Sequence, residues 1–373
     1  MAGKKRIVIC CDGTGNSFDT VSEESNVAKL YSSLALSESQ IAYYHPGVGT
    51  MGAPNASTRI GREWSRFKGL AFGSGLLENV GDAYRFLMDT FADGDQIFLF
   101  GFSRGAFTVR VLASLIHVFG LLCSGNHQLI PYILNMYAKR SKAAHHKRRT
   151  FDTDEAFKWQ FSHQNAVDIH FCGVWDTVSS YGWVYDPIEL PFLGCNPIIR
   201  TARHAVSIDE RRCYYQDNLW GEPQGHQDIR QVWFSGVHAD VGGSYAENES
   251  GLSKVALEWM FVEARKFGLE FDQFRAEALL GRDVPLPSVP GLPDFRMPNI
   301  KDCIHNSLHG IWWFLELLPH QDPHLNGKGF YIPLGRRRQI PNNSLVHESI
   351  LQRADRPSNL PAMWRREPWT PFE

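Results

Sequence analysis

Apolar runs alternate along the chain with amphipathic segments, and this alternation predicts strands and helices in turn. Apolar residues recur at helical spacing within three segments, with a serine placed to cap the first, at residues 25–36, 76–91 and 251–267. Near-continuous apolar runs predict five strands, at residues 6–11, 40–45, 96–101, 167–175 and 229–237. Such strands, alternating with helices, indicate a mostly parallel sheet with helices on both faces. We therefore predict an α/β fold.

Two segments interrupt this alternation, and a third follows it. Residues 123–165 are mostly helical and polar, and residues 180–227 are rich in Pro, Gly and aromatic side chains. We interpret both as cap insertions over the carboxyl edge of the sheet, where ligands bind in such folds. The sequence thus predicts a catalytic core over 1–260 and a Pro-rich C-terminal extension over 261–373, packed on that core.

The stretch "DQIFLFGFSRGAFTVR", residues 95–110, predicts a buried strand, a tight turn and a buried helix. Ser103 lies in the turn, and the surrounding "GFSRG" fits the pattern G-x-S-x-G between a strand and a helix. In that pattern a strained backbone projects the serine hydroxyl above the sheet, and the glycines let strand and helix pass closely. We predict that Ser103 is a nucleophile, with an ordinary Gly-rich turn as the alternative.

A nucleophilic serine needs a histidine base, which a carboxylate orients. Asp176 directly follows the strand predicted at 167–175, and His238 directly follows the strand at 229–237. Since parallel strands end at one edge of a sheet, both side chains are expected beside Ser103. The chain order Ser, Asp, His is the one used in α/β-hydrolases. We therefore predict an α/β-hydrolase-like fold with helical cap insertions and this catalytic triad.

Other residues compete for these two roles. His204 and His347 also lie beside apolar residues, and Asp240 lies two positions after His238. The second choice for the base is His347 paired with Asp240. We favour His238 as the base and interpret Asp240 as a support for the "DVGG" turn after its strand.

The loop "VICCDGTGNS" places glycines at the end of the first predicted strand. We predict that the backbone N–H groups of Gly13, Thr14 and Arg104 form an oxyanion hole, and that Asp12 holds the loop in shape. The alternative is a turn without a catalytic part. A phosphatase of the D-x-D-G-T type is disfavoured, because Cys10 stands where its nucleophile would be.

Composition and charge narrow the class of protein. A formal net charge of -2 gives no support to nucleic-acid binding. The seven cysteines include no CxxC pair, which favours reduced thiols over disulfides or a zinc site. We expect neither a metal nor an organic cofactor. The apolar start is too short for a Sec signal peptide, and no run approaches a membrane span, so we expect a cytoplasmic protein.

Seven motifs occur in a familiar order: "CCDGTGNS", "SNVAKLYSSL", "YYHPGVGT", "GDQIFLFGFSRGAFTVRVLASLI", "GVWDTVSSYG", "RHAVSIDERR" and "VWFSGVHADVGGSY". In these motifs the chain resembles, over about residues 5–260, an α/β-hydrolase family that includes type VI secretion phospholipase effectors. By this resemblance Ser103, Asp176 and His238 match the family's triad. The resemblance implies ester hydrolysis with a phospholipid as substrate, and it adds export by a type VI system as a second destination.

Two segments bear on lipid contact. The basic stretch at 139–149 could meet anionic head groups, and the aromatic stretch at 308–319 could be a lid or an interfacial helix. Each has an alternative without a function in lipid binding. The first segment could be a solvated helix face, and the second could pack on the core. We predict a serine ester hydrolase acting on phospholipid, with peripheral membrane contact. The alternatives are a carboxylesterase for other esters and an inactive hydrolase fold that serves as an interaction module.

Overall fold

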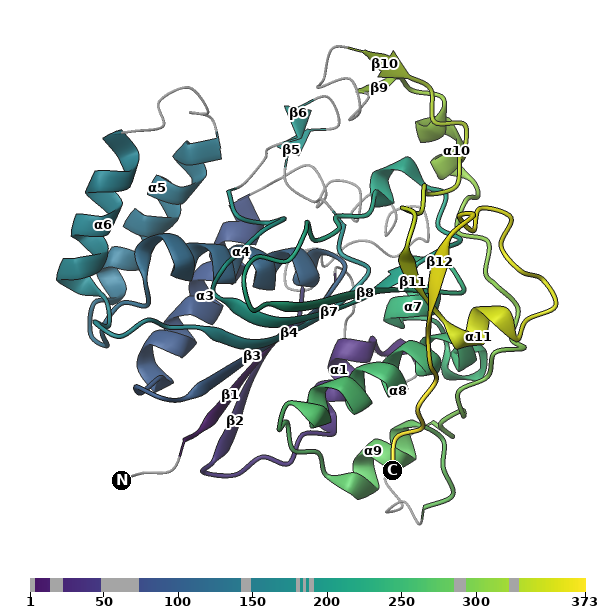
Figure 1. Ribbon diagram of the computed structural model, residues 1–373, viewed down its shortest axis with the longest axis horizontal. Coiled ribbons are helices and arrows are strands. Elements are labelled where there is room, and N and C mark those ends of the chain that lie inside the picture. Colours follow the sequence, from purple (N-terminus) through teal and green to yellow (C-terminus); the bar gives the residue numbers. More distant parts are fainter. Residues whose placement is uncertain are drawn as a thin grey trace, which may run out of the picture.

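The computed structural model describes residues 4–13, 23–47, 74–141, 149–178, 182–183, 186–187, 191–284, 293–321 and 329–373. Its centre is an eight-stranded sheet in the order β12-β11-β8-β7-β4-β3-β1-β2, with all neighbouring strands parallel (Figure 1). This confirms the predicted parallel α/β fold. The strands are β1 (Arg6–Cys11), β2 (Gln40–His45), β3 (Gln96–Phe102), β4 (Ile169–Trp175), β7 (Ile199–Ser207), β8 (Asp228–Phe234), β11 (Ser344–His347) and β12 (Trp364–Glu367).

Helices cover both faces of the sheet. Each strand contributes side chains to both faces, because successive side chains of a strand point in opposite directions. In β1, Ile7 and Ile9 join the core beneath α3 and α4, whereas Val8 and Cys10 join the core beneath α1 and α8. Figure 1 shows these two sets of helices on opposite sides of the strands. The helices are α3 (Ser74–Thr90) and α4 (Arg104–Phe119) on one face, and α1 (Asn26–Ser32), α8 (Gly251–Lys266) and α9 (Gln273–Leu279) on the other.

The segment at 123–165 is helical, as its pattern indicates. It forms η2 (His127–Leu129), α5 (Ile130–Ser141) and α6 (Arg149–Phe161). Tyr137 of α5 is buried and donates a hydrogen bond to Ser114 of α4 at 2.8 Å. These helices therefore form an outer layer on α3 and α4 (Figure 1).

The segment at 180–227 differs from the expected insertion, because it contains a central strand of the sheet. β7 lies between β4 and β8, yet its sequence holds the buried Arg203 and His204. Arg203 bonds to Glu263 at 2.5 Å and to Asp228 at 2.6 Å. These partners, distant in the sequence, allow a charged residue to be buried in a central strand. A search for apolar runs in the sequence does not find such a strand. The rest of the segment includes β5 (Gly182–Trp183), β6 (Asp186–Pro187) and η3 (Cys213–Tyr215).

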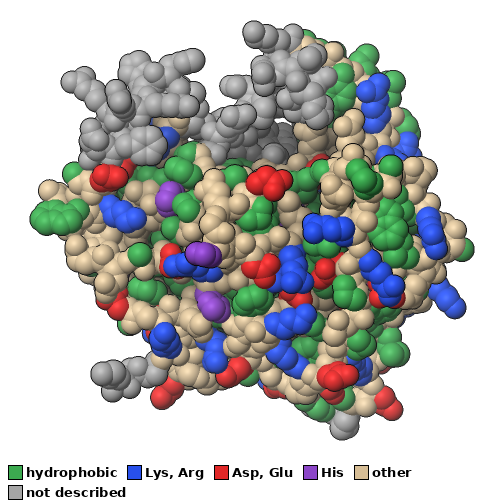
Figure 2. All heavy atoms as spheres, viewed as in Figure 1, with side chains coloured by type: hydrophobic (Ala, Val, Ile, Leu, Met, Phe, Trp, Pro, Cys, Tyr) green, Lys and Arg blue, Asp and Glu red, His purple; other side chains and the backbone are tan. Residues whose placement is uncertain are grey.

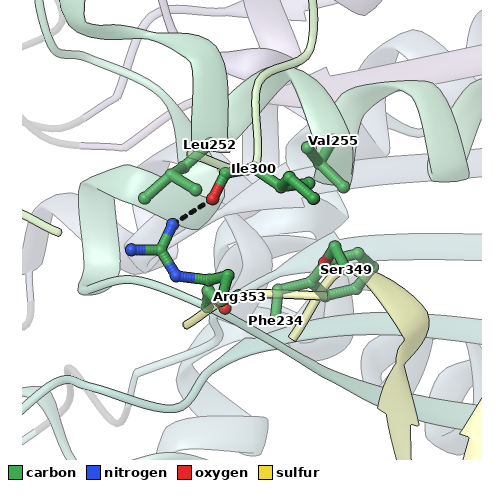
Figure 3. A pocket seen from close by; sticks show the side chains of 7 residues that line it. Phe234, Leu252, Val255, Ile300, Ser349 and Arg353 are labelled. Carbon is green, nitrogen blue, oxygen red and sulfur yellow. Dashed lines mark hydrogen bonds between the residues drawn. The ribbon is translucent and has the colours of Figure 1, made fainter. Parts of the chain in front are cut away.

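The C-terminal extension does more than pack on the core, since β11 and β12 extend the sheet beyond β8. Arg353 donates to the carbonyl of Ile300 beside a small hollow that includes Leu252, Val255 and Ser349 (Figure 3). This contact joins two parts of the extension, and residues of α8 line the hollow beside it. The remaining elements are α7 (His238–Gly242), η4 (Glu247–Glu249), α10 (Ile311–Glu316), β9 (His320–Gln321), β10 (Phe330–Tyr331) and α11 (Glu348–Leu351).

One face of the molecule carries both positive and negative side chains. On the face drawn in Figure 2, Lys and Arg side chains are interspersed with Asp and Glu. Among the helices of the described residues, none has both the length and the apolar character that crossing a bilayer requires.

Candidate active site

The turn between β3 and α4 is strained and tightly packed. Ser103 has φ 57° and ψ −120°, a conformation that costs an L-residue about 1–3 kcal/mol. A Cβ atom on Gly101 would lie 2.6 Å from the backbone of Ala106, and one on Gly105 would overlap the carbonyl of Cys11. Both glycines are therefore required by the close passage of strand and helix. Ser103 makes no side-chain cap to α4, so capping does not occupy its hydroxyl.

A buried histidine and a buried carboxylate meet at the ends of two other strands. Asp176 follows β4, and His238 opens α7 after β8. The Nδ1 atom of His238 lies 2.5 Å from Oδ2 of Asp176, and both side chains are buried. With Nδ1 directed at the carboxylate, Nε2 is the nitrogen that remains to accept a proton.

The serine turn lies at the same edge of the sheet as this pair. The backbone N–H of Ser103 donates to the carbonyl of Trp175 at 3.1 Å, which places the turn beside the end of β4. The ring of Phe102 lies 4.6 Å from the ring of His238, measured between centroids. A Cβ on Gly242 would overlap the Phe102 ring, so α7 packs directly on the residue before the serine.

Arg338, which the sequence analysis missed, binds the carboxylate of Asp176. Its Nη1 lies 2.5 Å from Oδ1 and its Nη2 lies 3.1 Å from Oδ2, and the backbone N–H of Ser207 donates to Oδ1 at 2.9 Å. Burial would raise the pKa of Asp176, but Arg338 and His238 overcome that effect and hold it well below its usual range. Asp176 is therefore a carboxylate in the folded protein.

His238 is held from its backbone as well. Its N–H donates to Glu210 at 3.1 Å, and Glu210 in turn forms an ion pair with Arg212 at 2.8 Å. Although burial opposes it, Arg212 lowers the pKa of Glu210 to about 2. Burial lowers the pKa of His238 itself, against the opposing effect of Asp176. The imidazole is therefore neutral at neutral pH. Glu210 stands in the "SIDERR" motif, which was the available signal for it.

The first loop lies against the serine turn. A Cβ on Gly13 would lie 3.3 Å from Cβ of Ser103. The carboxylate of Asp12 accepts hydrogen bonds at 2.6 Å from three donors, the N–H of Gly13 and the hydroxyls of Ser25 and Tyr44. Asp12 thus fixes the start of the loop. The Gly13 N–H donates to Asp12, and Thr14 lies outside the described residues.

The alternative pair of His347 and Asp240 is not formed. Nδ1 of His347 lies 2.9 Å from Oγ of Ser349, and its ring stacks on Phe234. Asp240 instead pairs with His305, with Oδ1 2.6 Å from Nδ1. The other oxygen of Asp240 accepts the N–H of Val237 at 3.0 Å, so this carboxylate supports the turn after β8.

His204 bonds to the backbone after β4 and not to Ser103. Its Nε2 accepts the backbone N–H of Thr177 at 3.1 Å, and burial lowers its pKa to about 3. Its Nδ1 lies 3.4 Å from Oε1 of Gln231. A neutral His204 thus supports the backbone just after Asp176.

Cys172 is a buried thiol of β4. Burial raises the pKa of Cys172 to about 12, which keeps it protonated. In the part of the chain that the structure describes, no three His, Cys, Asp or Glu side chains are grouped to hold a metal ion.

Comparison with known proteins gives the family. Residues 5–263 match the model of a family described as T6SS, phospholipase effector Tle1-like, catalytic domain. The uncharacterized protein YEL023C of Saccharomyces cerevisiae is 37% identical over 217 residues, which cover 56% of this chain and 31% of the yeast protein. The chain thus spans about a third of the length of that curated relative.

Two solved structures are similar at low identity. An uncharacterized protein from Pseudomonas aeruginosa matches with a TM-score of 0.43 and 18% identity, over 79% of this chain and 49% of that one. A Tle1 effector bound to the VgrG spike of the type VI secretion system matches with a TM-score of 0.35 and 17% identity, over 67% and 52% of the two chains. The family match, which covers more than half of the chain, confirms the resemblance found in the sequence. This chain belongs to the family of Tle1-like phospholipase effector catalytic domains.

Proposed function

We propose that this protein hydrolyses lipid esters with Ser103 as nucleophile, His238 as general base and Asp176 as the group that orients the base. Family membership supports a hydrolase of lipid esters. The observation that carries the finer assignment is the 2.5 Å contact of His238 with Asp176 beside a serine held at φ 57°.

The proposed reaction has two halves. Nε2 of His238 takes the proton of Ser103 as the hydroxyl oxygen attacks the ester carbonyl carbon, and a tetrahedral oxyanion forms. When the C–O bond breaks, the imidazolium returns the proton to the leaving alcohol. Water, deprotonated by His238, then attacks the acyl-enzyme, and the carboxylic acid and the free serine result.

The oxyanion needs donors that are in place before the charge develops. Arg104 begins α4 directly after Ser103, so its backbone N–H belongs to the first turn of a helix, where N–H groups favour negative charge. We assign this N–H as one donor. A second donor from Gly13 requires that its bond to Asp12 be exchanged for one to the substrate.

An exposed apolar surface supports a lipid substrate. Trp313 and Phe314 of α10 are exposed, as is Leu317 directly after it. Three residues of a later segment, Phe330, Ile332 and Leu334, are exposed as well. The N–H of Leu334 donates to the carbonyl of Glu316, which brings the two groups together. We define these six side chains as the apolar surface. Such surfaces mark contact with membranes or other partners, and we assign this one to a lipid interface.

The test of the proposed function uses Ser103→Ala. We expect hydrolysis of p-nitrophenyl butyrate to fall by about 10⁶-fold, to the background left by binding alone, while circular dichroism stays that of the wild type. A fluorophosphonate probe should label the wild type and not the variant. Undiminished turnover or labelling in Ser103→Ala would refute the proposal.

A further inference from the structure

A cavity of about 700 Å³ lies between the segment at 210–217 and the segment at 331–342. Its wall is unusually rich in guanidinium groups. Five arginines line it against two carboxylates, Glu210 and Asp217; the arginines are Arg211, Arg212, Arg336, Arg337 and Arg338. The guanidinium group is planar and permanently charged, and it binds phosphate through two parallel hydrogen bonds.

The cavity shares a wall with the candidate active site. The ring of Tyr215, which lines the cavity, lies 4.6 Å from the ring of His238, between centroids. Two other lining residues hold the same site, since Arg338 binds Asp176 and Glu210 accepts the N–H of His238. A molecule whose ester reaches Ser103 would therefore have its neighbouring groups close to this cavity.

Three of the five arginines already bind carboxylates. Arg212 pairs with Glu210 at 2.8 Å, Arg337 with Asp209 at 2.7 Å, and Arg338 with Asp176 at 2.5 Å. The last of these also lies 3.9 Å from Asp217, the second carboxylate of the wall.

The other two arginines differ. Within the described residues, no carboxylate forms an ion pair with the side chain of Arg211 or Arg336. The Nε of Arg211 donates to the carbonyl of Gly335 at 2.8 Å. Arg336 is exposed. These two guanidinium groups are placed to bind an anion from outside the protein.

The cavity also borders the apolar surface. A Cβ atom on Gly335 would lie 3.3 Å from Nη2 of Arg211 and 3.4 Å from the Trp313 ring. One residue thus separates a cationic group of the cavity from an aromatic side chain of the apolar surface. A phospholipid has the same order of groups, with a phosphate next to the apolar acyl region.

We propose that this cavity binds the phosphate group of a glycerophospholipid whose ester is hydrolysed at Ser103, with Arg211 and Arg336 as the principal ligands. The inference rests on the proposed function. It predicts selection of phospholipids over glycerides of the same acyl chains, and it assigns that selection to the C-terminal extension as well as to the segment after β7.

The experiment compares kcat/KM for phosphatidylglycerol with kcat/KM for diacylglycerol of the same chains, both in neutral detergent micelles. We expect the wild type to prefer the phospholipid, and R211Q/R336Q to lose that preference by about tenfold or more, the usual effect of losing charge-assisted hydrogen bonds. Arg275→Gln, on the exposed face of α9, is the matched control and should keep the wild-type ratio. An unchanged ratio in the double variant, or equal loss in the control, overturns the proposal.

A binding measurement separates this site from the catalytic assignment. Calorimetry with Ser103→Ala and monomeric dihexanoyl phosphatidylglycerol should show binding that disappears when R211Q/R336Q is added. If that binding is present while no ester is hydrolysed by the wild-type protein, the cavity assignment stands and the proposed function fails. Binding that persists without both arginines overturns the assignment. Inorganic phosphate that binds as tightly as the lipid shows a site for free anions and also overturns it.

Discussion

Two histidine–aspartate pairs in this protein have nearly the same geometry and opposite electrostatics. Nδ1 of His238 lies 2.5 Å from Asp176, and Nδ1 of His305 lies 2.6 Å from Asp240. Yet the pKa of His238 is lowered and the pKa of His305 is raised. The contact distance by itself therefore does not tell which imidazole can serve as a base.

The surroundings of the pairs explain the difference. Burial dominates at His238, and the charge of Arg212 adds to its effect. At His305 the hydrogen bond to Asp240 dominates, burial is weaker, and Glu249 adds a second negative charge at 3.4 Å. A general base must be neutral before the reaction, which the first environment favours and the second opposes.

Replacing each histidine in turn gives the largest expected contrast. His238→Gln should reduce kcat/KM for p-nitrophenyl butyrate by about 10⁴-fold or more, because the base is lost. His305→Gln removes a pair of nearly equal length whose histidine has a raised pKa, and it should leave the rate within about twofold. Steady-state kinetics and fluorophosphonate labelling measure both. If the two variants lost activity equally, the assignment of His238 would be wrong.

The next largest effect is the loss of stability expected when Arg338, which binds Asp176 of the first pair, is replaced. Arg338→Met leaves Asp176 buried without its cationic partner, which typically costs about 3–5 kcal/mol of unfolding free energy. Arg337→Met, whose partly exposed pair with Asp209 is worth roughly 0–1 kcal/mol, is the control. Urea titration measures both, and equal stability of the two variants would contradict the role given to Arg338.

A change in pH profile separates a positioning role of Arg338 from a merely structural one. Because Arg338 lowers the pKa of Asp176, its removal should raise that pKa. The acid limb of kcat/KM, which His238 sets in the wild type, should then move to higher pH as protonation of Asp176 comes to limit the rate. Arg338→Lys restores the charge and should restore the limb in part. A variant that loses activity without any shift of the limb would have a structural effect only.

The wild-type pH dependence follows from His238. Its lowered pKa means that the imidazole stays neutral below the usual histidine value of about 6.5. We therefore expect the acid limb of kcat/KM to be centred below pH 6.5. An acid limb centred above pH 7 would show that burial does not control this histidine.

The smallest expected effect is on stability at the second pair. The folded-state pKa of His305 is raised, so its stabilising contribution is complete below the unfolded value of about 6.5 and is lost as pH rises through the folded value. The wild type should therefore exceed His305→Gln in stability at pH 6 by roughly 0.2–1 kcal/mol, and by less at pH 9. Urea titration at both pH values measures this; a difference that grew with pH would have the wrong sign.

The sequence predicted the parallel sheet because most of its strands are continuous apolar runs. The predicted strands at 6–11 and 40–45 match β1 and β2 at both ends, and Ser25 caps α1 by accepting the N–H of Ala28, as expected. β7 was missed, since Arg203 and His204 interrupt its apolar pattern and find their partners only in the folded chain.

The candidate site also has residues that the sequence predicted and residues that it did not. Residues that follow strands could be placed from the chain order, and Ser103, Asp176 and His238 do lie at one edge of the sheet. Arg338 could not be placed, because it stands in a Pro-rich stretch without a motif and its carboxylate lies 162 residues earlier. Side chains that act through long-range ion pairs leave no local pattern in a sequence.

The position of Arg338 late in the chain has a consequence during synthesis. A ribosome completes β1 to β8 and all three proposed catalytic residues more than ninety residues before it reaches position 338. Until that arginine has docked, Asp176 lacks the cation that keeps it charged, and β8 lacks its neighbour β11. The proposed site is therefore complete only after position 338 has been made and its guanidinium group has docked on Asp176.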